Sequence, residues 1–293
     1  MKTFTLEPTS NKDLKRVVDR NGDWSFYKFL PTNQYLYSVN HILDLGYPKA
    51  PRLIEWMKKV SKEESDRKLK EGGERGDRIH QAIRILLSQG KIDRTTKVLA
   101  EDNKTLTNLT NDDWDALLAF QTFWERHGCV LHEMESAVKQ VVVGYAGTLD
   151  AIVTMTKSCE VKSCKCNGFI GCRGLFDWKS SAGIYDSYGP QVAAYAHCVE
   201  VEPDYSAILR IGTYHKTTGG YEVEFYSKEE TEIHHNEFRS ALELAKPNLV
   251  PFKESEIYDI PDAITLTKRE IKTKKPRKPR AKKVATKSKS KHT

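Results

Sequence analysis

The length and composition of this 293-residue sequence predict a globular chain with a packed core, large enough for one large domain or two small ones. Hydrophobic residues make up 39% of the sequence and charged residues 30%. No run approaches the 18 apolar residues of a membrane-spanning helix, which excludes an ordinary membrane protein. The opening residues MKTFTLEPTSNKDLKR have no apolar segment, so we expect no secretory signal.

The formal net charge of +7 is distributed unevenly along the chain. Of the 47 Lys and Arg and the 40 Asp and Glu, residues 268–293 hold 13 and one respectively, so residues 1–267 carry a formal charge of −5. The basic segment has almost no large apolar residues and is expected to be disordered, because burial cannot offset its ordering entropy. It is interpreted as an arm that contacts the phosphate backbone of nucleic acid or as a nuclear-import signal. The alternative is a solubilising tail.

The first half of the chain is predicted to be mainly helical. Residues 1–34 are polar and predict irregular structure, with a short hairpin around Asn21-Gly22. Helical spacing follows, and Gly72-Gly73 is expected to interrupt it because glycine disfavours helix. Apolar spacing and terminal Pro, Gly or capping residues predict helices over 35–45, 50–71, 74–90 and 111–128.

The pattern changes to strands after Gly128. Residues 129–156 are rich in β-branched residues and predict two antiparallel strands that turn near Val143–Gly147. GLFDW at 174–178 predicts a third strand. The remaining expected elements are a helix over 188–200, strands over 205–215 and 220–226, and a helix over 227–245 that Ser227 caps.

Together these elements predict a single α/β domain over residues 1–267, with a mixed central sheet flanked by helices. An N-terminal helical part would occupy about 35–128 and a core about 129–246. A cysteine-rich hairpin insertion is expected at 157–174, and the basic tail 268–293 would follow the domain.

The insertion holds four of the six cysteines, namely Cys159, Cys164, Cys166 and Cys172. Structural disulfides are not expected in a chain without an export signal. Four thiolates in a short Gly-containing hairpin could bind a structural Zn²⁺ in a tetrahedral site. The alternative is a loop with unrelated, reduced thiols.

Asp177 and Lys179 end a strand that should be buried, where isolated charges are costly. Residues two apart in a strand point to the same side, so the carboxylate and the ammonium project together. Asp150 lies in the preceding apolar strand, and pairing of the two strands would bring Asp150 and Asp177 together. Converging carboxylates repel unless a cation joins them, and oxygen-rich sites suit Mg²⁺ or Mn²⁺. The alternative is a buried Asp–Lys ion pair beside an unrelated aspartate.

Four further polar residues accompany this set. Glu135 precedes Asp150 by one hairpin arm, and His80 lies on a predicted helix. Gln191 and Tyr195, four residues apart on the helix after GLFDW, share a helix face. Each has a structural alternative: a surface strand glutamate, a structural histidine and a helix-surface pair.

Six short motifs occur in order between residues 37 and 196: YSVNHIL…LIEW (37–56), RGDRIH (75–80), ES-x-V (135–138), YAGTLD (145–150), FDWK (176–179) and Q-x-x-x-Y (191–195). In this order they resemble the PD-(D/E)XK nuclease superfamily, in its RecB-like and phage-type exonuclease branch, and are similar to mitochondrial genome-maintenance exonucleases. The resemblance implies a restriction-endonuclease-like nuclease core. Two departures are Leu149 in place of the motif's Pro and Asp177 where many members have Glu.

The resemblance implies a metal site. Asp150 and Asp177 would be the metal-binding carboxylates, the backbone carbonyl of Trp178 a further ligand, and His80 the additional histidine ligand of RecB-like members. Mg²⁺ or Mn²⁺ is the cofactor that this set implies.

The resemblance also implies roles around the metal. Lys179 would be the catalytic lysine, and Glu135 an outer ligand or the residue that holds the attacking water. Gln191, Tyr195 and Arg75 would position the substrate backbone or Lys179.

The implied activity is metal-dependent hydrolysis of phosphodiester bonds from DNA ends, in recombination, repair or phage DNA processing. The alternatives are a structure-specific endonuclease and a non-catalytic DNA-binding adaptor of the same fold. The intact set of Asp150, Asp177 and Lys179 argues against the adaptor.

The expected partner is DNA, single-stranded or with a free end, together with a recombination or single-strand-binding protein, and no membrane contact is expected. No iron–sulfur cluster is expected, because relatives that hold one place one Cys before the nuclease core and three after it. The expected location is the cytoplasm of a bacterium or phage-infected cell, or the nucleus or an organelle in a eukaryote.

Overall fold

A computed structural model describes residues 4–19, 25–100, 105–161, 164–213, 219–249 and 257–258. The chain divides into two units, Met1–Asp259 and Ile260–Thr293, and every described residue belongs to the first. The predicted basic tail, 268–293, lies outside the described residues.

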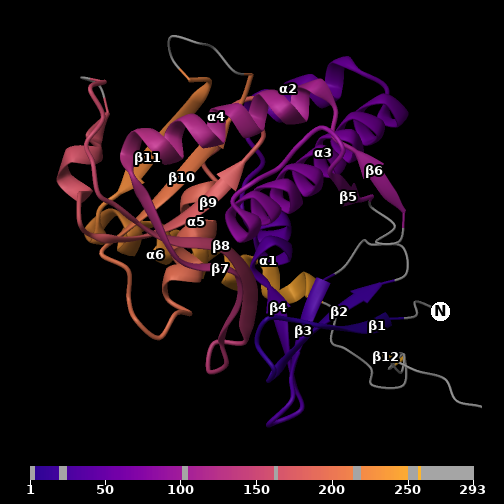
Figure 1. The fold of residues 1–293 in the computed structure, drawn as a ribbon. Helices are drawn as coiled ribbons and strands as arrows, with labels where there is room; N and C mark the ends of the chain where they lie inside the picture. Colours follow the sequence, from indigo (N-terminus) through magenta and orange to yellow (C-terminus); the bar gives the residue numbers. More distant parts are fainter. Residues whose placement is uncertain are drawn as a thin grey trace, which may run out of the picture. The chain divides into compact units, whose positions relative to one another are not determined.

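One mixed sheet of ten strands organises the described part of the first unit (Figure 1). Its path runs β11 (Tyr221–Tyr226), β10 (Tyr205–Ile211), β9 (Arg173–Lys179), β8 (Tyr145–Met155), β4 (Gln34–Ser38), β3 (Ser25–Phe29), β2 (Leu14–Asp19), β1 (Phe4–Pro8) and β12 (Ile257–Tyr258). Strand β7 (Cys129–Gln140) pairs with β8 off this path. The pairs β8–β9 and β10–β11 are antiparallel, whereas β9–β10 and β4–β8 are parallel, so the predicted mixed α/β class is confirmed.

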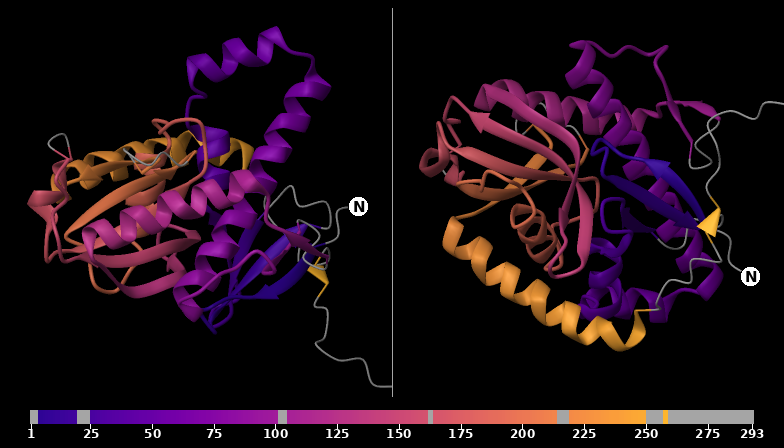
Figure 2. Two further views of the ribbon diagram at one scale, coloured as in Figure 1. Left: turned by 45° about the horizontal axis from the view of Figure 1, so that its top comes forward. Right: turned by 90° about the horizontal axis from the view of Figure 1, so that it is seen from below.

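Helices cover both faces of the sheet. Helices α3 (Lys62–Gln89) and α4 (Asn111–His127) bury Ile79, Phe120 and Phe123 against the Phe176 and Trp178 face. Helices α1 (Val39–Gly46), α5 (Tyr188–Ala196) and α6 (Lys228–Ala245) pack in a second core on the Leu175 and Ile208 side. Figure 2 shows α4 and α6 on opposite sides of the sheet.

The remaining elements of the described residues are the short helix α2 (Pro51–Lys59), a two-stranded sheet of β5 (Lys97–Leu99) and β6 (Leu106–Asn108), and the 3₁₀ turns Lys165–Phe169 and Lys246–Asn248. Within the described ranges, no helix combines the length and the apolar character needed to cross a membrane.

The core strands and helices follow the sequence prediction closely. Strands β7 and β8 form the expected antiparallel pair, and β9 is the expected third strand. Helices α4 and α6 begin at capping boxes formed by Thr110 with Asp113 and by Ser227 with Glu230. Helix α5 ends at Ala196, earlier than the predicted residue 200.

The N-terminal segment differs from the prediction of irregular structure. Residues 4–19 and 25–38 contain β1 to β4, and side chains such as Leu14, Val17 and Phe26 are buried. Residues 34–38 are therefore a strand rather than the start of a helix. The strands β2 and β3 that flank Asn21-Gly22 pair antiparallel, and the turn itself lies outside the described residues.

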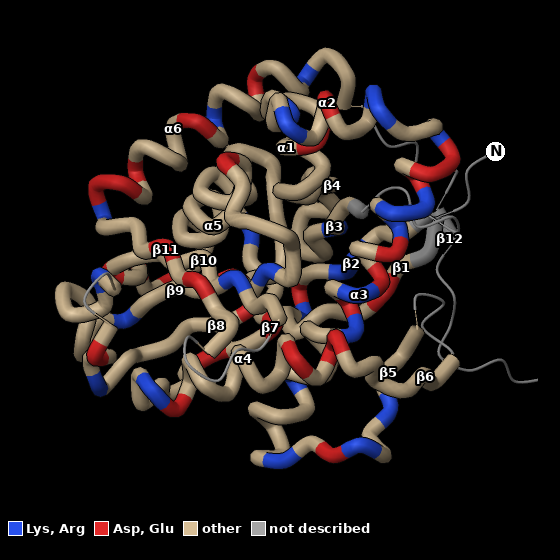
Figure 3. The backbone as a smooth tube through the Cα atoms, turned by 90° about the horizontal axis from the view of Figure 1, so that it is seen from above, with Lys and Arg blue, Asp and Glu red and all other residues tan. Residues whose placement is uncertain are grey.

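The helix break expected at Gly72-Gly73 is wrong, because α3 runs through both glycines. The break falls earlier, where Ser61 caps α3 by accepting the Glu64 amide at 3.2 Å. Two interior glycines cost a helix about 2 kcal/mol. Ion pairs one helical turn apart, such as Arg67 with Glu64 at 2.8 Å, offset part of this cost. Figure 3 shows basic and acidic positions interspersed along α3.

Candidate active site

Strand pairing brings the predicted acidic residues together. Ala151 pairs with Phe176 across β8 and β9, and Met134 and Ser136 pair with Ala151 and Leu149 across β7 and β8. Glu135, Asp150 and Asp177 therefore lie on three neighbouring strands. Helix α3 adds His80 to this cluster, and α5 adds Gln191 and Tyr195.

His80 joins Asp150 to the end of β9. Its Nδ1 lies 3.2 Å from Oδ1 of Asp150, and its Nε2 lies 3.1 Å from the carbonyl oxygen of Trp178. The Trp178 amide donates to Oδ2 of Asp150 at 2.7 Å. Burial alone lowers the pKa of His80, but the nearby carboxylates, above all Asp150, outweigh it and raise the pKa to about 9. With this pKa the His80 ring is a cation at neutral pH, with a proton on each nitrogen. A metal ion bound by either nitrogen would displace the proton from that nitrogen.

Glu135 faces the same place from a strained backbone. Its φ of 48° lies in the left-handed region, which costs a non-glycine residue about 1–3 kcal/mol and recurs at functional sites. One potential ligand atom each from His80, Glu135 and Asp150 lies within 4.8 Å of the others. Burial and the charge of Asp150 raise the pKa of Glu135 to about 7. Carboxylate oxygens with a backbone carbonyl and an imidazole are a donor set that can hold a divalent metal ion.

Asp177 and Lys179 form an ion pair, with Nζ 2.7 Å from Oδ2. Gln191 binds both partners, since its Oε1 accepts from Lys179 at 2.9 Å and its Nε2 donates to Oδ1 of Asp177 at 3.3 Å. The same Nε2 lies 3.2 Å from the hydroxyl of Tyr195. Burial raises the pKa of Asp177 to about 6, although Lys179 opposes the shift. Burial lowers the pKa of Lys179, yet Asp177 and Asp150 raise it overall, so its side chain is an ammonium.

The alternation of β9 explains how charges can end a buried strand. Phe176 and Trp178 point toward α4, where Trp178 meets Phe120 edge-on with ring centroids 5.3 Å apart. Asp177 and Lys179 then face α5 and its Gln191. The large apolar side chains fix the strand, and the polar ones are held by partners rather than left isolated.

Arg75 lies beside the cluster rather than within it. Its Nη1 donates to the backbone oxygen of Ser180 at 2.6 Å, which ties α3 to the segment that directly follows Lys179. One turn further, Arg78 pairs with the fully buried carboxylate of Asp113 at 2.9 Å. These contacts join α3, α4 and the end of β9, and so fix where His80 lies.

Two residues of the site were not singled out from the sequence. The Tyr195 hydroxyl donates to Oδ1 of Asn40 at 3.5 Å, and Nζ of Lys179 lies 4.6 Å from the ring centroid of Tyr188. Asn40 stands inside the motif YSVNHIL, and Tyr188 precedes Gln191 by three helical positions. Their places in the sequence indicated proximity to the site. Helical spacing alone, however, does not distinguish a site residue from a residue that only packs in the core.

The cysteine-rich insertion differs from the predicted hairpin with four sulfur ligands. Its described residues form a loop with the 3₁₀ turn Lys165–Phe169 and contain no strand between β8 and β9. Three of the cysteines lie together with a histidine in the group His127, Cys159, Cys164 and Cys166, which does not include Cys172.

Among known proteins, this chain is similar to solved structures of low sequence identity. No protein-family model matches the sequence, and no curated protein matches it. The chain is similar to the crystal structure of an alkaline exonuclease (LHK-Exo) from Laribacter hongkongensis, with 9% identity and a TM-score of 0.32 over 73% of this chain and 92% of that chain. For LHK-Exo in complex with dAMP the identity is 10%, with the same TM-score and coverage. The sequence identity and the TM-score are low in both cases, so the function is argued from the site geometry.

Proposed function

We propose that the protein is a metal-dependent DNA exonuclease of the PD-(D/E)XK type. The observation that carries this proposal is the charge of the buried cluster. Three carboxyl groups, those of Glu135, Asp150 and Asp177, converge on Lys179 and His80. Without a metal ion, a protonated His80 and the raised pKa of Glu135 reduce the net negative charge of the cluster. A divalent cation that displaced the His80 proton would supply this positive charge instead and allow all three carboxylates to ionise.

Some residues of the site would bind the metal ion, and others would act on the phosphate group. Asp150, Asp177, the Trp178 carbonyl and His80 would hold the ion, and Glu135 would bind it or its water. A bound Mg²⁺ or Mn²⁺ supplies activation of water and neutralisation of phosphate charge.

Lys179 is the group on this chain that would act on the substrate. Its ammonium would stabilise the charge that develops on a phosphoryl oxygen as water attacks in line. Gln191 fixes Nζ at 2.9 Å, and Tyr195 supports the Gln191 amide from the next turn of α5. The lysine is therefore held in one orientation before substrate arrives.

Action from DNA ends is proposed from the ordered motifs, which resemble the RecB-like and phage-type exonuclease branch and its mitochondrial relatives. The basic segment 268–293 would add phosphate contacts, because the rest of the chain has a formal charge of −5 and repels DNA.

The test compares end-labelled linear duplex DNA with covalently closed circular DNA in Mg²⁺. We expect loss of the linear DNA only, and no loss with Lys179→Ala or Asp177→Ala. A matched control is Lys68→Ala, since Lys68 also follows an aspartate by two residues but is half exposed on α3, 3.5 Å from Glu64.

Three results would contradict the proposal. Linearisation of the circle would indicate an endonuclease. DNA binding without cleavage of either substrate would indicate an adaptor. Full activity of Lys179→Ala would refute the role of the lysine.

A further inference from the structure

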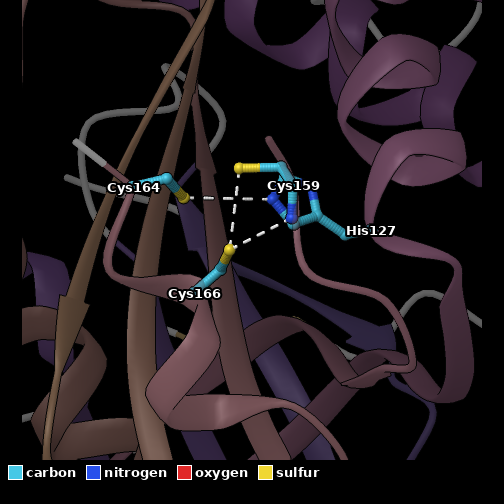
Figure 4. Close-up of side chains that lie close together, drawn as sticks. All are labelled: His127, Cys159, Cys164 and Cys166. Atoms are coloured by element: carbon cyan, nitrogen blue, oxygen red, sulfur yellow. Dashed lines mark hydrogen bonds between the residues drawn. The ribbon is translucent and has the colours of Figure 1, made fainter. Parts of the chain in front are cut away.

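A cluster of histidine and cysteine side chains lies at the far end of α4 from the candidate active site. The first turn of α4 meets Arg75, which also binds the segment after β9. His127 is the last residue of this helix, about 22 Å along its axis. There its ring meets Cys159, Cys164 and Cys166 from the loop between β8 and β9. Figure 4 shows the four side chains directed toward one another.

From this geometry we propose that His127, Cys159, Cys164 and Cys166 bind a structural Zn²⁺ ion that fastens the β8–β9 loop to the end of α4. All four ligand atoms lie within 4.8 Å of one another. Four protein ligands complete a tetrahedral shell and leave no position for substrate, which is the arrangement of structural rather than catalytic zinc.

Two of the six separations between these ligand atoms are close to those of a tetrahedral shell. With Zn–S of about 2.3 Å and Zn–N of about 2.0–2.1 Å, tetrahedral angles place two sulfurs about 3.8 Å apart and a sulfur and a nitrogen about 3.5 Å apart. The Sγ atoms of Cys159 and Cys166 lie 3.6 Å apart. Sγ of Cys164 lies 4.0 Å from Nε2 of His127. The other four pairs of ligand atoms lie within 4.8 Å, so shifts of up to about 1 Å would complete the site.

The hydrogen bond on the other side of His127 supplies an independent observation. Nδ1 lies 2.9 Å from the carbonyl oxygen of Phe123, and a carbonyl only accepts, so Nδ1 carries the proton. Nε2 then presents its lone pair to the three thiols. This is the hydrogen-bonded tautomer of metal-ligating histidines, whose second nitrogen usually donates to a carbonyl or carboxylate. The ring is fully buried in α4 and cannot turn toward solvent.

A hydrogen bond also positions one of the cysteine ligands. Cys166 is fully buried and lies in the 3₁₀ turn Lys165–Phe169, and its Sγ accepts the backbone amide of Cys159 at 3.4 Å. An amide donor of this kind stabilises negative charge on a sulfur ligand. The loop is otherwise short of regular structure, so a metal crosslink to α4 would supply its rigidity.

The direct test is the metal content of the full-length protein, purified under reducing conditions without chelator and measured by mass spectrometry. We expect about one zinc per chain in the wild type, and loss of at least nine-tenths of it in Cys164→Ser and in His127→Ala. The matched controls Cys172→Ser and Cys198→Ser should keep it, because neither thiol belongs to the group.

A second measurement uses the wild type alone, so its result holds even if the variants fail to fold. Replacing the metal with Co²⁺ in the wild type should give thiolate-to-cobalt charge-transfer bands and the visible bands of tetrahedral cobalt. Removal of the metal by chelation should expose Cys159, Cys164 and Cys166 to alkylation together.

Three results would overturn the proposal. The first is wild-type protein that takes up neither zinc nor cobalt. The second is metal that His127→Ala retains and Cys172→Ser loses, which would indicate four sulfur ligands. The third is a disulfide between Cys159 and Cys166 in protein kept under reducing conditions. None of these readouts involves DNA cleavage, so failure of the proposed nuclease activity would leave the zinc proposal intact, and the reverse.

Discussion

Gln191 offers a graded test of how the candidate site is organised. We predict that Gln191→Met, which keeps the length of the side chain but removes the amide, lowers the rate of DNA hydrolysis by about 10- to 150-fold. The substitution removes the 2.9 Å hydrogen bond to Lys179 and the 3.3 Å bond to Asp177. A hydrogen bond to a charged group contributes about 1.5–3 kcal/mol, and about 1.4 kcal/mol corresponds to a factor of ten in rate.

The assay is single-turnover hydrolysis of end-labelled linear DNA in saturating Mg²⁺, with DNA affinity measured separately without Mg²⁺. Affinity should change less than the rate, because Gln191 acts through Lys179 and Asp177. Tyr195→Phe is the graded control, since it removes only neutral contacts, to Gln191 at 3.2 Å and to Asn40 at 3.5 Å, and should lower the rate by about 2- to 13-fold. A folded Gln191→Met protein within twofold of the wild-type rate would refute this reasoning.

Two further predictions concern the frame of the site. In Gly147→Ala the new Cβ would lie 2.4 Å from Cε1 of Tyr195. We therefore expect a free energy of unfolding lower by about 1–3 kcal/mol and reduced DNA hydrolysis. The control is Gly183→Ala, whose Cβ would meet open space and which should change neither quantity. Asp113→Asn should destabilise the protein by about 1–3 kcal/mol at pH 7 in urea titrations, since it removes the ion pair with Arg78. Burial raises the pKa of Asp113, but Arg78 and the α4 cap hold it below its ordinary value. The carboxylate therefore stabilises the fold above about pH 4, and this contribution is lost as the pH falls through the lowered pKa. The gap between wild type and Asp113→Asn should close in acid, and a gap that widens there would contradict the assignment.

The central strands could be predicted because their pairing is local. β7 and β8 are joined by a short turn, and the alternation of residues 129–156 fixes which side chains share a face. The position of Asp177 and Lys179 at the end of an apolar strand then predicted their proximity, which the ion pair at 2.7 Å bears out. The roles of these residues in catalysis stay predictions.

Contacts between distant segments were not predictable in the same way. Asn40 meets Tyr195 across 155 positions, and His127 meets Cys164 across 37, so no periodicity relates them. His127 reaches the loop because the rigid length of α4 sets where its last residue lies. Strands β2 and β3 flank the hairpin expected at Asn21-Gly22, whereas β1 and β4 were missed because short polar segments show little alternation, and each gains its stability from the neighbouring strand.

The most direct test of the central claim is release of nucleotides from 5′-end-labelled linear duplex DNA, with and without Mg²⁺, by the wild type and by Asp150→Asn. Asp150 accepts from the Trp178 amide and lies beside His80, so the asparagine variant keeps the shape of the site but loses a charged metal ligand. We predict Mg²⁺-dependent release by the wild type and a loss of at least a hundredfold in the variant. Release that persists without divalent metal, or equal release by the two proteins, would contradict a metal-dependent nuclease site at β8 and β9.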